Sequence, residues 1–540
     1  MKRIKVLLYI AVVAFSTIGI HSCYDDKSTL ATLFIDEVVI DTTGIKAEQY
    51  IGYQERLTIA PNITIGKGNS ESALLYEWSL ALFSKNNSEF EVISTDKVFD
   101  EVISRPISGA PYTLKLTVID TKNDNLQYQC LWEVFVQSSF LDGLLISDTR
   151  DGNSSDLTLI MNNKITVNYD KEEKIYQRIL ENAYGAPYNK LMNSLTYELF
   201  GNAVIQNSGT GQVWAITDDG ECVRFHTEDF SINGTFDDES IMTYKPDGLK
   251  FISLFRGYQM FFAYTTSGFY SFMNVSTNSF GWYDTTMKGY SPNNGIIAST
   301  SSSSTNSNHT VWLDNNKNQF ASYSGSSSLF GAISTYEANT IFDPNAMAGH
   351  KAMAAGIHED GNIATFLLKD NASGEYAIYT LGQYKDADNL ATARNKYDIP
   401  NEGKGLIDNA VSIFFAQKEN VLYVATEGAI YAILYGSGDD AVVSTIPKYS
   451  ASSGETITKA KLYQQGHHMN DSYVTTSTPP NVTPLEWNNK AIILTTQKGD
   501  FEGKVHLLPI SQPGIGTLDP SKGLTYDGFG KILDVITVGY

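Results

Sequence analysis

Cysteine is scarce in this chain of 540 residues, which contains only Cys23, Cys130 and Cys222. Cys130 and Cys222 each lie in an alternating apolar–polar pattern typical of strands, and we expect them to fall in different domains. We therefore expect two buried free thiols rather than a disulfide. So few cysteines also exclude a cysteine-ligated zinc site and cysteine-based redox chemistry.

Basic residues are the second shortage. The chain has 39 Lys and Arg against 60 Asp and Glu, which gives a formal charge of −21. An acidic surface repels phosphate backbones and anionic membranes, so nucleic-acid binding is disfavoured and no basic patch serves as a membrane anchor. We assign most of this charge to solubility. The 42% hydrophobic content indicates a globular protein, and the length indicates two or three domains.

Long apolar runs are also rare, and the prominent one spans Val6 to Phe15. It follows three basic residues near the N-terminus and precedes the small and polar segment 16–22. This is the layout of a secretory signal peptide, and it is too short to span a membrane as a mature helix. Removal of residues 1–22 would take away those three basic residues and no acid, and would lower the formal charge from −21 to −24.

The end of this signal carries a recognisable motif. Ile20-His21-Ser22-Cys23 resembles a bacterial lipobox, which has an aliphatic residue, a small residue directly before the cysteine, and the cysteine itself. The resemblance implies that Cys23 is lipidated and that residues 23–30 form a tether. Asp25 and Asp26 resemble the acidic export signal that sends Bacteroidetes lipoproteins to the outer face of the outer membrane. The alternative is an ordinary secreted protein whose signal ends in Ser22-Cys23.

Residues 31–138 predict a small β-sandwich. Apolar and polar residues alternate at 57–59, 112–120 and 132–136, which is typical of strands with one buried face. The segment 120–125 is rich in residues that favour turns. Tyr76-Glu77-Trp78 and the strand 112–120 resemble elements of PKD and related immunoglobulin-like domains, although the usual Gly-Asp pair after the tryptophan is missing. Such domains usually act as spacers.

From residue 139 to residue 540 the sequence predicts repeated hairpins. Seven apolar hairpins begin at residues 144, 213, 261, 311, 363, 421 and 491. A four-stranded propeller blade takes about 40–50 residues, so we expect an all-β protein with a β-propeller of about seven blades after the sandwich. Six or eight blades remain alternatives. The apolar segment 531–538 is expected to complete the first blade and close the ring, which removes exposed sheet edges.

Two insertions interrupt this pattern. Segment 171–200 contains Ile175, Ile179 and Leu180 in the spacing of a short amphipathic helix that we expect to be foreign to the blades. Segment 446–486 is rich in Ser, Thr, Pro and Gly and contains His467-His468-Met469. Insertions of this kind either form partner and ligand surfaces or are loops without such a role.

No motif for catalysis or metal binding survives inspection, so we predict no enzyme activity, no cofactor and no metal site. Segment 358–362 lacks the second histidine of a zinc-protease motif and predicts a hairpin turn. His467 and His468 would point to opposite faces of a strand, so a solvated loop is the better interpretation of this pair than a metal site. The best calcium candidates are polar turns that lack the glycine and glutamate of an EF-hand. These turns contain Asp314, Asn316 and Asn318 in one case and Asp148, Asp151 and Asp156 in the other.

Tyrosine is abundant, with 32 residues. We expect the hairpin tyrosines to pack between blades, with some of them at the central channel or on a face, where an amphipathic ring suits sugars and peptides. Sequence alone leaves the ligand-binding residues unknown. The hairpin tyrosines are Tyr264, Tyr270, Tyr323, Tyr376, Tyr379, Tyr423 and Tyr431.

Taken together, the lipobox, the acidic export signal, the PKD-like spacer and the propeller resemble the PKD-like lipoproteins of gut Bacteroidetes. The resemblance implies a lipid-anchored protein on the outer face of the outer membrane. It would act as a non-catalytic accessory subunit of a SusC/SusD-type, TonB-dependent uptake complex, with a SusC-like transporter and a SusD-like lipoprotein as partners. Its ligand would be an oligopeptide or an oligosaccharide. The rivals are a propeller-based glycan-degrading enzyme, which needs two carboxylates about 5–10 Å apart, and a structural or adhesion protein.

Overall fold

The computed structural model describes residues 38–53, 55–67, 69–82, 90–105, 111–140, 142–167, 169–200, 210–237, 239–256, 260–273, 280, 288–299, 309–326, 329–358, 363–382, 391–465 and 485–539. This part of the chain is mainly strand, and its α-helices are α2 (Ile179–Tyr184) and α4 (Asn401–Asp408). Internal contacts divide the chain into two compact units. The first comprises Met1–Ile51, Arg56–Val102 and Ser108–Phe135, and the second comprises Gly52–Glu55, Ile103–Ile107 and Val136–Tyr540.

The first unit is built from antiparallel strands and confirms the predicted sandwich-type fold. Its largest sheet has the order β2 (Glu48–Gly52), β9 (Leu126–Gln137), β8 (Tyr112–Asp120), β5 (Leu74–Leu82) and β6 (Glu91–Ser94). Two smaller sheets pair β1 (Val38–Asp41) with β4 (Asn62–Ile65), and β3 (Arg56–Ile59) with β7 (Phe99–Val102), and the 3-10 helix η1 (Glu71–Ala73) precedes β5.

Aromatic side chains form the core of this unit. Trp78 lies fully buried between Phe99 and Trp132, with ring centroids 5.2 Å and 5.5 Å away. The turn after β8 is held by Asp120, whose carboxylate accepts hydrogen bonds from the backbone N–H of Lys122 and the amide of Asn123. The tryptophan motif and the polar turn noted in the sequence therefore both have structural roles.

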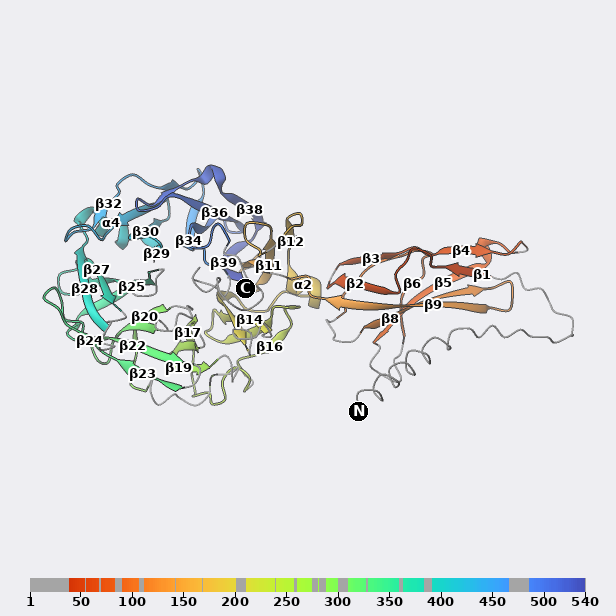
Figure 1. Ribbon diagram of the computed structural model, residues 1–540, viewed down its shortest axis with the longest axis horizontal. Helices are drawn as coiled ribbons and strands as arrows, with labels where there is room; N and C mark the ends of the chain where they lie inside the picture. The colour runs from red at the N-terminus through yellow and green to blue at the C-terminus, as the bar shows by residue number, and fades with distance from the viewer. Residues whose placement is uncertain are drawn as a thin grey trace, which may run out of the picture. The chain divides into compact units, whose positions relative to one another are not determined.

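The described residues of the second unit form a ring of seven sheets, which confirms the predicted β-propeller (Figure 1). We call these sheets blades 1 to 7 and give their strands from the inside outward. Blade 1 consists of β39 (Lys531–Val538), β10 (Gly143–Thr149), β11 (Asp156–Met161) and β12 (Lys174–Tyr176), blade 2 of β13 (Met192–Phe200), β14 (Thr210–Thr217), β15 (Cys222–His226) and β16 (Ile232–Gly234), and blade 3 of β17 (Phe251–Arg256), β18 (Met260–Thr265) and β19 (Gly268–Met273). Blade 4 consists of β20 (Pro292–Ser299), β21 (His309–Asp314), β22 (Gln319–Ser326) and β23 (Leu329–Ser334), and blade 5 of β25 (His350–Ile357), β26 (Ile363–Asp370), β27 (Tyr376–Gly382) and β28 (Ala391–Asp398). Blade 6 consists of β29 (Ala410–Phe415), β30 (Val421–Thr426), β31 (Ala429–Leu434) and β32 (Val442–Val443), and blade 7 of β34 (Thr456–Leu462), β35 (Ala491–Lys498), β36 (Glu502–Gln512) and β38 (Leu524–Phe529).

A few short elements complete the blades. β24 (Tyr336–Glu337) pairs in parallel with β28, and β33 (Tyr449–Ser450) pairs with β31. β37 (Thr517–Leu518) pairs with β36 and is followed by the 3-10 helix η3 (Pro520–Lys522). Each of the seven predicted hairpins is present as the two strands next to the inner strand of its blade.

The ring is closed by the C-terminal strand, as the sequence predicted. β39 pairs antiparallel with β10 over Gly143↔Val538 to Thr149↔Lys531, so the last strand of the chain is the inner strand of blade 1. The inner strands contact one another in the order β39, β13, β17, β20, β25, β29 and β34, and β39 also contacts β35 and β36 of blade 7. Strands from both ends of the propeller sequence thus meet at one junction.

Each inner strand has an irregular register against its neighbour. The pairing shifts near the start of β13, β17, β20, β25, β29 and β34, and in β39 it skips Leu533 between Ile532 and Asp534. A bulge bends a strand and re-aims the side chains beside it. These shifts therefore change which side chains of the inner strands face the centre.

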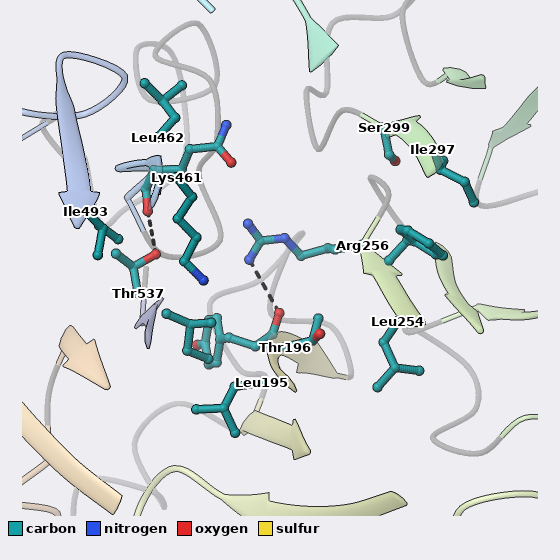
Figure 2. Close-up of a pocket in the computed structure, with 14 residues that line it drawn as sticks. Leu195, Thr196, Leu254, Arg256, Ile297, Ser299, Lys461, Leu462, Ile493 and Thr537 are labelled. Atoms are coloured by element: carbon teal, nitrogen blue, oxygen red, sulfur yellow. Dashed lines mark hydrogen bonds between the residues drawn. The ribbon is translucent and has the colours of Figure 1, made fainter. Parts of the chain in front are cut away.

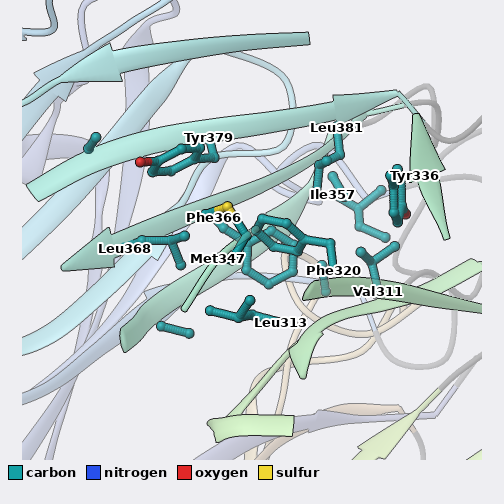
Figure 3. Close-up of a cluster of buried hydrophobic side chains, with 14 residues drawn as sticks. Val311, Leu313, Phe320, Tyr336, Met347, Ile357, Phe366, Leu368, Tyr379 and Leu381 are labelled. Atoms are coloured by element: carbon teal, nitrogen blue, oxygen red, sulfur yellow. The ribbon is translucent and has the colours of Figure 1, made fainter. Parts of the chain in front are cut away.

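Apolar side chains fill the space between blades. Between blades 4 and 5, Val311 and Phe320 pack against Phe366 and Leu381, and all four are buried (Figure 3). The hairpin tyrosines follow the same pattern, as expected: Tyr270, Tyr323, Tyr376, Tyr379 and Tyr423 are buried within inter-blade clusters, whereas Tyr264 and Tyr431 are only partly buried.

The structure corrects both predicted insertions. Within 171–200, residues 174–176 form the outer strand of blade 1 and residues 192–200 form the inner strand of blade 2, so only the part around α2 lies between blades. The predicted helix begins at Ile179, and Ile175 lies in a strand. Within 446–486, β33 and β34 are also blade strands. Short strands flanked by charged residues gave too weak an alternation to be recognised.

Candidate functional site: the central cavity

A cavity of about 290 Å³ lies where the inner strands β13, β17, β20, β34 and β39 converge (Figure 2). This volume is close to the lower end of the range of about 300–1,000 Å³ typical of small-molecule sites. Apolar side chains such as Leu195, Leu254 and Ile536 form much of the wall. Of the described residues that line the cavity none is acidic, and the polar ones are Thr196, Tyr197, Arg256, Ser299, Lys461, Gln464 and Thr537.

Two cationic side chains project into this cavity from opposite walls. Figure 2 shows the guanidinium of Arg256, at the end of β17, and the ammonium of Lys461, on β34, directed toward the same space. Arg256 Nη1 donates a hydrogen bond to the carbonyl oxygen of Tyr197 at 3.4 Å. Among the described residues, Tyr197 O is the hydrogen-bond acceptor of Arg256. This contact uses one of the five N–H groups of the guanidinium.

Lys461 is positioned by a buried carboxylate on the closing strand. Its Nζ lies 3.1 Å from Asp534 Oδ1, and the Nζ of Lys459 lies 2.9 Å from the same oxygen. The other carboxylate oxygen of Asp534 accepts a hydrogen bond from the backbone N–H of Leu195 at 2.8 Å. Because Asp534 directly follows the skipped residue Leu533 of β39, the bulge helps to direct this side chain. A single carboxylate therefore links the inner strands of blades 1, 2 and 7.

Charge interactions determine the ionisation of Asp534. Burial raises the pKa of this carboxyl, but the facing charges of Lys461 and Lys459 outweigh burial and lower the pKa to about 2. Burial in turn lowers the pKa of Lys461, and the pull of Asp534 opposes that decrease. Asp534 is therefore a carboxylate at neutral pH that holds two lysine side chains beside the cavity.

The local charge balance is positive. Burial lowers the pKa of Arg256 and the buried carboxylate of Glu198 acts against it, but a guanidinium stays protonated in proteins at neutral pH. Counting Arg256 and the two lysines against Asp534 and Glu198 leaves one positive charge in excess. This excess contrasts with a chain whose formal charge is −21.

None of the described residues that line the cavity is a site residue predicted from the sequence. Cys23, Asp25 and Asp26, like the histidine pair at 467–468 and most of segment 358–362, lie outside the described residues. Cys130 and Cys222 are free, as expected. Cys222 is buried, and burial raises its thiol pKa. Cys130 is half-buried rather than buried, because it lies on the same face of β9 as the buried Trp132 and Val134 but toward the less covered beginning of the strand.

The calcium candidates are turn residues whose carboxylates are already occupied. Asp314 accepts hydrogen bonds from the backbone N–H of Asn316 and Lys317 and from the indole of Trp312. Asp156 accepts from Leu180 N and Glu181 N at the start of α2, and burial raises its pKa to about 6. Across the described residues, no group of three or more His, Cys, Asp or Glu could hold a metal ion.

A buried histidine also has a structural role. Both ring nitrogens of His506 lie 2.9 Å from threonine hydroxyls, those of Thr496 and Thr525. Burial lowers the pKa of His506, so its neutral form fits the folded state. These partners join β35, β36 and β38, and His506 is not among the residues that line the central cavity.

Sequence reasoning missed Arg256 and Lys461. Both lie on inner strands that the alternation did not reveal. A usable signal for Arg256 was a basic residue just before the third hairpin of an acidic chain, whereas Lys461 is too far in sequence from the seventh hairpin to give such a signal.

Comparisons with known proteins address the fold. Two solved structures that this chain matches are a quinonprotein alcohol dehydrogenase-like protein from Bacteroides thetaiotaomicron and the β-propeller domain of the Trilobed protease from Pyrococcus furiosus. The first has a TM-score of 0.41 and 14% identity, and the match covers 91% of this chain and 96% of the other. The second has a TM-score of 0.22 and 11% identity, with 78% and 90% covered.

A search of curated proteins finds no match. Among the described residues, no helix is long and apolar enough to cross a membrane. The model of the PKD-like family matches residues 23–187, a range that includes the sandwich unit and runs into blade 1 through α2. Residues 23–187 of this chain are therefore similar to the PKD-like family, and the described residues of the second unit form a seven-bladed β-propeller.

Proposed function

We propose that this protein is a lipoprotein on the outer face of the outer membrane, anchored through Cys23. It serves as a non-catalytic accessory binding subunit of a SusC/SusD-type, TonB-dependent complex that takes up oligopeptides or glycans. The lipobox-like segment, Asp25 and Asp26 support the location, and the PKD-like family supports a spacer next to the tether. The observation that carries the binding role is the central cavity, where Arg256 and Lys461 face a common space between apolar walls.

Such a cavity suits binding rather than covalent chemistry. Small-molecule sites combine apolar walls with a few convergent polar groups, and this cavity has both. The glycan-degrading rival requires a pair of facing carboxylates. Of the described residues that line the cavity none is acidic, and the buried carboxylate of Asp534 is already held by two lysines.

The partner proposal is tested by affinity purification from native outer membranes in mild detergent. We expect a TonB-dependent transporter and a SusD-like lipoprotein to be recovered with this chain. Mass spectrometry of the eluate identifies both the proteins and any bound small molecules. Recovery of this chain alone, with neither transporter nor ligand, would contradict the uptake role and favour a structural or adhesion protein.

The anchor is tested separately with Cys23→Ala. We expect this variant to lose its lipid and to be released from the membrane fraction. Surface labelling of intact cells reports whether the remaining protein is exposed. A variant that stays membrane-bound and accessible to the label would show that the anchor lies elsewhere. Asp25→Ala with Asp26→Ala is the matched control for export, because it keeps the lipid and changes only the acidic signal.

A further inference from the structure

We propose that the central cavity binds the C-terminal carboxylate of a peptide, with Arg256 and Lys461 holding the two carboxylate oxygens and the apolar wall contacting the last side chain. This inference rests on the proposed binding function and names the chemistry of its ligand. It is carried by the charge, the walls and the size of the cavity.

The charge of the cavity selects an anion. Two cationic side chains directed at a common space repel each other, and an anion placed between them removes that repulsion. Arg256 presents a planar fork of N–H donors that matches a carboxylate, while Lys461 adds a point charge from the opposite wall. The carboxylate of Glu198 acts on Arg256, and Lys461 shares Asp534 with Lys459, so that three cations face two carboxylates and one positive charge is in excess.

The walls favour a peptide end over a sugar acid. Apolar side chains including Leu195, Leu254 and Ile536 surround the charged groups, and a sugar ring would place hydroxyls against them without hydrogen-bond partners. A C-terminal residue with an apolar side chain places its carboxylate on the cations and its side chain on that wall. The volume of about 290 Å³ suits the end of a chain rather than a long segment.

The strand geometry prepares the site before any ligand arrives. Asp534 forms an ion pair with Lys461, and Tyr197 O accepts a hydrogen bond from Arg256. Both charged groups are thus positioned by backbone or buried atoms of neighbouring inner strands. Less side-chain freedom is lost on binding when the groups are already ordered, which strengthens the interaction.

The experiment is a calorimetric titration of the full mature chain at low salt. The probe is N-acetyl-Gly-Gly-Leu with a free C-terminal carboxylate, and its control is the same peptide with a C-terminal amide. We expect saturable binding of the free acid and at least about a tenfold weaker binding of the amide, the loss expected for one charge-assisted hydrogen bond. Equal binding of acid and amide, or no saturable binding of the acid up to about 1 mM, would overturn the inference.

Variants locate the interaction. Arg256→Gln and Lys461→Gln are each expected to weaken binding of the free acid by at least about tenfold. Lys504→Gln is the matched control, because Lys504 lies in the same blade and pairs with the carboxylate of Glu455 but does not line the cavity. Circular dichroism and the melting temperature show whether each variant is folded, and Arg256→Lys provides a milder second change at that position. If Lys504→Gln weakens binding as much as Lys461→Gln, the cavity assignment fails.

Two further probes separate other anions. Digalacturonate that binds while the free-acid peptide does not would overturn the peptide assignment and favour an acidic sugar. Inorganic phosphate that competes as strongly as the peptide would overturn the preference for carboxylates. None of these outcomes depends on co-purification with a transporter. Failure of the titration and failure of the uptake role are therefore recorded by different experiments.

Discussion

The junction between blades 4 and 5 and the junction that closes the ring join neighbouring sheets in different ways. The first depends on apolar contacts, such as the pair of buried rings of Phe320 and Phe366 with centroids 5.0 Å apart. The second has apolar contacts too, but it adds a directional set of bonds centred on Asp534.

This difference has a physical reason. Apolar contacts are non-directional and tolerate small shifts of one sheet on the next. A carboxylate that must reach two ammonium groups and one backbone N–H is satisfied in a single register. The closing strand β39 follows the other blade strands in sequence. Its link to blades 2 and 7 therefore sets the register in which the ring closes. The same link places Lys461 at the cavity.

The largest effect should come from removing the closing strand. A chain truncated after Gly530 lacks the whole of β39, so blade 1 loses its inner strand and β10 gains an unpaired edge. We expect loss of cooperative unfolding and aggregation, measured by circular dichroism and size-exclusion chromatography. Removal of only the last two residues is the control and should leave both measurements unchanged. A monomeric, cooperatively folding truncation would show that the ring does not need its closing strand.

The next largest effect should come from the apolar junction. Phe366→Ala leaves a cavity at a fully buried position and is expected to lower the free energy of unfolding by about 3–5 kcal/mol. Because the contact is apolar, this loss should not depend on salt. Urea denaturation at low and high salt measures it, and Phe366→Leu serves as a milder control. A strong salt dependence of the Phe366→Ala effect would contradict the contrast between the two junctions.

A smaller, pH-sensitive effect is expected at the ring closure. Asp534→Asn removes a charged acceptor and should cost about 1.5–3 kcal/mol at neutral pH. The folded-state pKa of about 2 lies below the unfolded value, so this stability is present above about pH 4 and is lost as the pH falls toward 2. Denaturation curves from pH 7 to pH 2 should therefore show the variant and the parent converging in acid.

The control for that variant is an exposed pair in the first unit. Asp100 lies 2.9 Å from Arg56, and both side chains are at least half exposed. Asp100→Asn should change the stability by no more than about 0.5 kcal/mol. Equal effects of Asp100→Asn and Asp534→Asn would remove the special role of the closing junction.

The smallest effect is expected at His506, in blade 7 but away from the cavity. Burial lowers its pKa, so the unfolded chain binds a proton more readily than the folded chain does. Stability should therefore fall as the pH drops below the unfolded value of about 6.5, by at most about 1.4 kcal/mol per pH unit. The slope of stability against pH between 7 and 5 should decrease in His506→Gln. An unchanged slope would assign the pH dependence to other groups.

The fold was largely predictable because the middle strands of each blade are buried on both faces. Residues 421–425 and 491–494 are continuous apolar runs, and their hairpin turns carry glycine or aspartate. The closing strand 531–538 was predictable from its apolar residues, although it is an inner strand with partly exposed positions.

The site was not predictable because it lies on the inner strands. The register shifts there break the period-two alternation, and β20, with the sequence PNNGIIAS, has hardly any strand signal of its own. Arg256 and Lys461 are 205 residues apart in sequence, and only the closed ring brings them to one cavity. No local pattern contains that information, because the proximity of the two residues results from the number of blades and from closure.

The position of β39 also affects when the propeller can finish folding. Gly530 N donates to Asp148 at 2.7 Å across 382 residues of sequence, so the first blade stays incomplete until the last residues have been made. Contacts between such distant residues form slowly, because a long loop must close first. A chain that stops before β39 therefore leaves β10 with an unpaired edge.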